Sequence, residues 1–117
     1  MFRDFLLDEG KSLMGDIIRV LALGLGRLWL SELVAEVNAF RYTLGVEGLV
    51  SEDDVKYALK VLEENGIVIC ENRFRSQLLG ESVLDVLVSL TNYSSVLNEL
   101  KSDLRYNEYI DKYKVRL

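Results

Sequence analysis

Residues 51–76 constrain the fold of this chain more than any other stretch, because a capped helix leads directly into an extended run. Ser51 can accept a hydrogen bond from the N–H of Asp54, and Asp54 can reach back to the N–H of Ser51, which is a capping box with Asp in place of Glu. Gly66 can adopt the left-handed conformation that ends a helix. The apolar residues between them have helical spacing: Val55, Ala58, Leu59 and Leu62. The sequence therefore predicts a helix over residues 51–66.

The residues after this helix predict a β-hairpin. Residues 67–70 are a short, apolar and mostly β-branched run, which is typical of a strand. Glu71 and Asn72 supply turn chemistry, and residues 73–76 can return as the partner strand.

Two further helices are predicted before residue 51. Residues 12–23 have one apolar face and end at Gly24-Leu25-Gly26. Residues 28–30 are a short extended piece, after which Ser31 is expected to cap a second helix that runs to about Leu44. Gly45 stops that helix, and residues 45–50 turn the chain into the helix that begins at Ser51. Residues 1–9 are either a short amphipathic helix or a frayed terminus.

The C-terminal third predicts a long helix that starts at Ser82, where Asp85 repeats the capping-box spacing. Seven apolar positions alternate gaps of three and four residues, as a heptad seam does: Val83, Val86, Leu90, Tyr93, Leu97, Leu100 and Leu104. Weak helix formers over residues 91–95 predict a kink or break. The seam either pairs with a second copy or packs back onto the core. The tail over residues 105–117 carries three tyrosines and is either an interface or a disordered basic end.

Composition narrows the function classes. The chain has 117 residues, which is the size of one domain, and 50% of them are hydrophobic. It has no histidine, so Ser–His and Cys–His catalytic pairs are impossible and the commonest transition-metal ligand is missing. The single cysteine, Cys70, lies in an apolar run and is expected to be inert. We therefore expect no enzyme activity and no cofactor or metal. We also expect a cytoplasmic protein with no membrane span.

The candidate nucleic-acid contacts lie on the residue 51–66 helix and on the hairpin. They are Lys56, Tyr57, Lys60, Asn72, Arg73 and Arg75. Arg73 and Arg75 alternate across Phe74, so both can point to one side of a strand. The alternative is that these are ordinary solvated charges. The net charge of −5, and the three acids that open the helix, disfavour conventional insertion of this helix into a DNA groove.

The order of these elements resembles the winged-helix superfamily, in particular small archaeal one-domain proteins with an added C-terminal helix. The resemblance rests on the helix over residues 51–66 that leads into the hairpin. It implies an α+β, mostly helical fold with a three-helix core, a small β-hairpin wing and a long C-terminal helix. The winged-helix domain would span residues 1–80, with its core at about 12–76, and a dimerisation or packing segment would span 81–117.

The function that this resemblance implies most often is transcription regulation by a dimer that binds double-stranded DNA. The seven seam residues would then form the dimer contact. The alternative is a winged-helix module that binds protein in an assembly and does not bind DNA. A weaker third hypothesis is a small-molecule sensor with a pocket between the long helix and the core.

Overall fold

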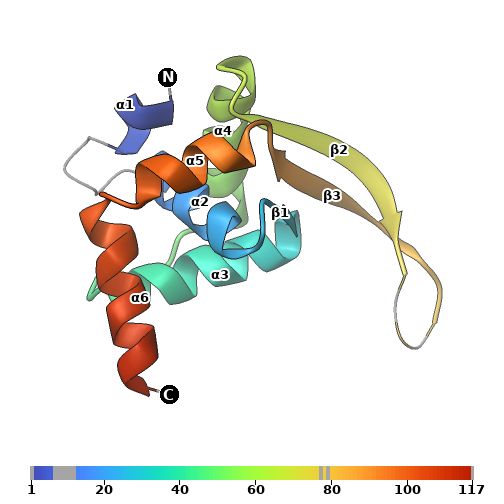
Figure 1. Ribbon diagram of the computed structural model, residues 1–117. Helices are drawn as coiled ribbons and strands as arrows, with labels where there is room; N and C mark the ends of the chain where they lie inside the picture. The colour runs from blue at the N-terminus through green and yellow to red at the C-terminus, as the bar shows by residue number, and fades with distance from the viewer. Residues whose placement is uncertain (1, 7–12, 77, 79, 117) are drawn as a thin grey trace.

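The computed structural model describes residues 2–6, 13–76, 78 and 80–116, and it is an α+β structure in which helices pack beside a small sheet (Figure 1). The elements in chain order are α1 (Phe2–Leu6), α2 (Leu13–Leu23), β1 (Arg27–Trp29), α3 (Leu30–Thr43), α4 (Glu52–Glu64), β2 (Val68–Arg75), β3 (Val83–Leu90), α5 (Tyr93–Leu100) and α6 (Leu104–Arg116). Ser12, predicted as the first residue of a helix, lies outside the described residues, as do residues 7–11.

The predicted capping box at the start of α4 is confirmed. Asp54 donates its N–H to Ser51 Oγ at 3.1 Å, and Ser51 donates its N–H to Asp54 Oδ2 at 3.1 Å. Hydrogen bonding to the Asp54 carboxylate from the Ser51 backbone, and then from the Ser51 side chain, holds the pKa of that carboxyl below its usual value of 3.8. At the other end Gly66 has a φ of 73°, the left-handed conformation expected of it.

The predicted extended piece before the second helix is also confirmed, one residue earlier than expected. β1 (Arg27–Trp29) pairs antiparallel with β3, which gives a three-stranded sheet in the order β1-β3-β2. The predicted cap at Ser31 is wrong, because α3 already begins at Leu30. The Ser31 hydroxyl instead donates to Asp85 Oδ2 on β3 at 2.9 Å.

The predicted hairpin within residues 67–76 is wrong in its partner. β2 runs without a turn through Glu71 and Asn72, and it pairs along its whole length with β3, from Val68 opposite Leu90 to Arg75 opposite Val83. The two strands project well beyond the helices and are joined by a loop at their far end (Figure 1). Because β3 supplies the backbone hydrogen-bond partners of β2, the chain does not turn back at Glu71.

The predicted long C-terminal helix is likewise wrong. Its first part, from Val83 to Leu90, is strand β3, and the remainder forms the separate helices α5 and α6. Asn92 caps α5 by accepting a hydrogen bond from the Ser95 N–H at 3.2 Å, inside the stretch where a break was predicted. The tail is helical, as α6. The seven seam positions therefore do not share one helical stripe.

Most seam residues pack onto the core of the chain itself. Leu90 and Leu100 are buried core residues, and Val86, Tyr93 and Leu97 pack against them or their neighbours. Val83 and Leu104 are exposed. The remaining core comes from the facing sides of the other helices, with Ile17, Leu21, Leu33, Val37, Val55 and Leu62 among its fully buried members.

Candidate functional site

The three predicted nucleic-acid contacts on α4 are exposed. Tyr57 is 68% exposed, and Lys60 has no acidic partner among the described residues. Lys56 lies 3.4 Å from Glu52 on the preceding turn, an i,i+4 ion pair between exposed side chains. Only part of the predicted positive charge on this helix is therefore free to meet a phosphate.

The other three predicted contacts lie on β2, whose far end points away from α4 (Figure 1). Arg73 Nη2 is 2.9 Å from Glu71 Oε2 on the same strand. Asn72 is exposed, next to this pair. The structure thus splits the predicted cluster into two groups on different elements, and it gives Lys56 and Arg73 acidic partners.

Of the predicted contact residues, Arg75 has the most carboxylate and ring partners. Its guanidinium lies 3.4 Å from Asp85 Oδ2 and 3.5 Å from Glu32 Oε2. It also lies over the Trp29 ring, 5.6 Å from the ring centroid. Arg75 therefore ties β2 to β3 and to the start of α3, and its charge is offset by two carboxylates.

The projecting part of the β2–β3 hairpin carries exposed apolar side chains. Phe74 and Leu84 are directly opposite each other on the two strands and are 75% and 62% exposed. Leu78, in the loop that joins the strands, is fully exposed. Nearer the helices the same strand face is covered by the core, at Val68 and Val88. This apolar face therefore continues beyond the part of the chain that covers it.

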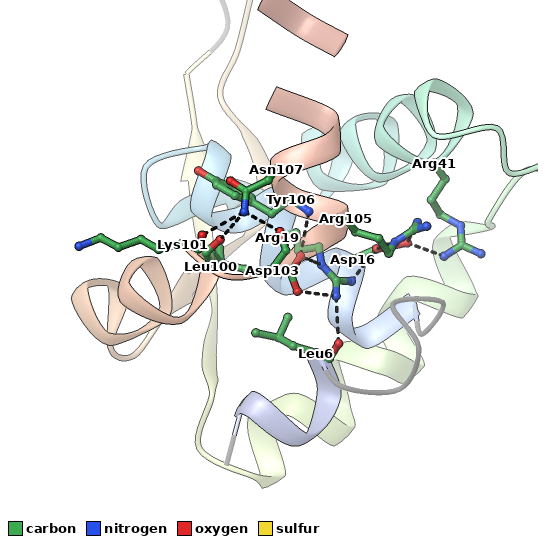
Figure 2. A network of polar contacts seen from close by, with 10 residues as sticks. All are labelled: Leu6, Asp16, Arg19, Arg41, Leu100, Lys101, Asp103, Arg105, Tyr106 and Asn107. Carbon is green, nitrogen blue, oxygen red and sulfur yellow. Dashed lines mark hydrogen bonds and ion pairs between the residues drawn. The ribbon is translucent and has the colours of Figure 1, made fainter. Parts of the chain in front are cut away.

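A network of buried charges, which the sequence reading missed, joins the two ends of the chain (Figure 2). Asp16 and Arg19, both on α2, have no exposed surface, and they form an ion pair of 2.9 Å. Arg19 also donates two hydrogen bonds to the Asp103 carboxylate, of 2.8 and 3.0 Å, and one to the Leu6 carbonyl oxygen of 3.2 Å.

Asp16 is the second hub of this network. It accepts from Arg41 Nη1 at 2.7 Å, and from Arg105 Nε and Nη2 at 3.0 and 2.8 Å. Asp103 also accepts the N–H of Tyr106, at the start of α6. Every buried side-chain nitrogen and oxygen among the described residues has a partner. Asp16, Arg19 and Asp103 together hold α1, α2, α3 and α6, so the network is structural. The available signal was a pair of opposite charges three residues apart in an otherwise apolar helix.

Cys70 is half-buried on β2, and its thiol is not activated as a nucleophile, as expected. Burial, and then the negative charge of Glu63, raises the pKa of its thiol from 9.0 to about 11. The Glu63 carboxylate accepts the Cys70 backbone N–H at 2.8 Å. A thiol in this state is a poor nucleophile at neutral pH.

The described residues contain no group of three or more Asp, Glu or Cys side chains arranged to hold a metal ion. None of the helices in the described parts of the chain is long and apolar enough to cross a membrane. Comparison with protein-family models, with curated proteins and with solved structures found no match to this chain. Function has to be argued from the residues and their geometry.

Proposed function

We propose that this chain is a winged-helix module that works as a protein-interaction subunit and assembles with a second copy of itself through the outer edge of β2. The winged-helix assignment is supported by the order of elements α2-β1-α3-α4-β2-β3 and by the strand order β1-β3-β2. In this assignment the β2–β3 hairpin is the wing, and α4 is the helix that precedes it.

The observation that carries the proposal is the uncovered apolar pair Phe74–Leu84 on a projecting hairpin. Scattered exposed apolar residues are ordinary, but a pair in register that continues a buried strand face marks a surface for another protein. Acidic partners of Arg73 and Arg75 make the same hairpin a weak surface for phosphates.

The outer edge of β2 fits a second β2 strand. In the described part of the chain β2 pairs with β3 alone, so its other edge offers backbone donors and acceptors to a partner. Antiparallel pairing of two copies centred on Asn72 would place Glu71 opposite the partner's Arg73, and the partner's Glu71 opposite Arg73. Opposite charges in facing positions stabilise paired strands, and a two-fold contact requires this self-complementarity.

The same register also covers apolar surface. It would place Phe74 opposite the partner's Cys70, on the face that continues the core. Along β2, residues whose backbone groups point toward β3 alternate with residues whose backbone groups point to the free edge. The Cys70 N–H points to the free edge, where it is bonded to Glu63. In the dimer this N–H would exchange the Glu63 carboxylate for a carbonyl oxygen of the partner strand.

Size-exclusion chromatography with light scattering tests this function. We expect the intact protein to elute at twice the mass of the chain and the Phe74→Ser variant to elute as a monomer. Leu49→Ser is the matched control, because Leu49 is 88% exposed but lies in the turn before α4. A monomeric intact protein across the micromolar range would contradict the proposal, and so would equal effects of the two variants.

Double-stranded DNA is the second candidate ligand, favoured by Lys60, which lies beside Tyr57 on α4, is exposed and has no acidic partner among the residues that the structure describes. The same chromatography with a mixed-sequence duplex at low salt tests it. If DNA is bound, Lys60→Ala should reduce the salt slope of binding by about 1, the value for one lost phosphate contact. Failure of the intact protein to bind the duplex would remove this candidate and leave the strand-edge dimer unaffected.

A further inference from the structure

A cleft of about 470 Å³ lies between α2, β1, α3 and α6, away from the hairpin edge. Its apolar wall includes Leu23, Leu28 and Phe40, and α6 contributes Tyr109 and Tyr113. This volume is within the range of about 300–1,000 Å³ that small-molecule sites occupy. In Figure 1, α6 runs past the C-terminal part of α3, and ring contacts join the two helices there.

The polar groups of the cleft are acidic. Glu32, Glu36 and Phe40 follow one another at intervals of four residues on α3, so they lie on one face of that helix. Glu36 is exposed and has no hydrogen-bond or ion-pair partner among the described residues. Glu32 is partly engaged, at 3.5 Å from Arg75 Nη2. None of the described residues that line the cleft is a lysine or an arginine.

The aromatic rings stand in a row along the α6 side. The Phe40 and Tyr109 ring centroids are 4.8 Å apart, and those of Tyr109 and Tyr113 are 6.3 Å apart with nearly parallel planes. Tyr113 ends the row, lines the cleft and is 52% exposed. Aromatic ring faces attract cations, and quaternary ammonium ligands are commonly recognised by such rings.

We propose that this cleft binds an organic cation with an apolar body, of the quaternary ammonium or phosphonium class. The apolar body would lie against Leu23 and Leu28. The positive charge would lie between the Glu36 carboxylate and the Tyr113 ring. None of the described lining residues belongs to β2, although Glu32 contacts Arg75 of that strand, and the site does not require the chain to dimerise.

Isothermal titration calorimetry with tetraphenylphosphonium and tetraphenylborate tests the proposal, because these two ions share shape and apolar area but have opposite charge. We expect one phosphonium ion to bind per chain and the borate to bind on the order of tenfold more weakly, from the combined ring and carboxylate contributions. Equal binding of the two ions, or tighter binding of the borate, would overturn the assignment of a cation.

Paired variants separate this site from the general attraction of an acidic protein. Glu36→Gln should weaken phosphonium binding about threefold, the effect of one exposed carboxylate. Glu64→Gln makes the same charge change on α4, which does not line the cleft, and should leave binding unchanged. Equal losses in both variants would overturn the proposed location.

Filling the cleft gives a readout that does not depend on charge. Ile110→Trp places a large side chain in the lining and should abolish phosphonium binding, while circular dichroism shows whether the fold is retained. Arg75→Met should strengthen binding about twofold, because it removes the cation that pairs with the Glu32 carboxylate. A folded Ile110→Trp protein that binds the ion as tightly as the unmodified chain would overturn the proposal.

Discussion

Arg19 and Asp103 are 84 residues apart in the sequence and form two hydrogen bonds, Nε to Oδ1 at 2.8 Å and Nη2 to Oδ2 at 3.0 Å. Arg19 is fully buried on α2, and Asp103 lies just before α6. A bidentate pair of this kind is among the strongest polar contacts in proteins. It fixes where the C-terminal helices attach to the core, and it therefore also fixes the α6 wall of the cleft.

Removing the Arg19 guanidinium should lower the free energy of unfolding substantially. Arg19→Met leaves the buried Asp16 and the Asp103 carboxylate without one of their donors, and breaking one partner of a buried pair costs about 3–5 kcal/mol. Urea unfolding followed by circular dichroism measures the loss in free energy of unfolding. Arg27→Met is the control, because Arg27 is exposed on β1, with a hydrogen bond of 3.5 Å to Ser89. A loss as small as that of the control would show that the network adds no stability.

The capping box gives a second stability prediction. Ser51→Ala should lower the free energy of unfolding by about 1 kcal/mol, because it removes the acceptor for the Asp54 N–H. Ser82→Ala should have little effect, since Ser82 is exposed in the loop before β3 and begins no helix. The same urea experiment compares the two variants, and equal losses would contradict this account.

The Asp54 contribution also depends on pH with a defined sign. The pKa of this carboxyl is lower in the folded chain than its ordinary value of 3.8, so its stabilising effect is present above that value and is lost as the pH falls through the folded pKa. In the Asp54→Asn variant this part of the acid-induced loss of stability should be missing. Urea titrations of the intact protein and of this variant, between neutral pH and about pH 3, measure how the free energy of unfolding falls with pH. An equal fall in the two proteins would show that the account is wrong.

Local signals in the sequence predict the elements that local chemistry determines. The Ser51–Asp54 box and the left-handed Gly66 both depend on residues within a few positions of one another. The identity of the strand that pairs with β2 does not depend on nearby residues. Val83, Val86 and Leu90 fit a heptad as well as they fit a strand, and only pairing with β2 decides between the two.

In the candidate site, too, features set by nearby residues could be predicted and contacts between distant segments could not. The exposure of Tyr57 and Lys60 followed from the apolar stripe of α4, because the opposite face of an amphipathic helix meets solvent. The acidic partner of Arg75 on α3, and the meeting of Phe40 with Tyr109, depend on contacts between distant segments. A single sequence carries no periodic signal for such contacts, so the cleft could be predicted only as a pocket beside a C-terminal helix.

Cys70 should react slowly with alkylating agents. Because its thiol pKa is raised from 9.0 to about 11, the native protein should contain on the order of 100-fold less thiolate at pH 8 than the unfolded chain. Iodoacetamide labelling followed by mass spectrometry, with and without urea, measures the ratio. The raised pKa also means that the native state should lose stability as the pH rises above about 9, a loss that Cys70→Ala should reduce. Equal labelling rates in the two states would contradict the burial of this thiol.

Charge exchange along β2 tests the register of the proposed dimer. In a pairing centred on Asn72, Glu71→Arg gives each strand two facing arginines, and Arg73→Glu gives each strand two facing glutamates. Each variant alone should therefore be monomeric, since like charges directly opposite destabilise paired strands.

An equimolar mixture of the two variants should restore the dimer, because each arginine then faces a glutamate on the other copy. Light scattering of the separate and mixed samples measures this recovery, with Phe74→Ser added to one variant as the control that should prevent it. A mixture that stays monomeric while the intact protein dimerises would reject the Asn72-centred register and keep the strand edge as the contact. A monomeric intact protein would instead reject the dimer itself, because the outer edge of β2 would then have no second strand beside it.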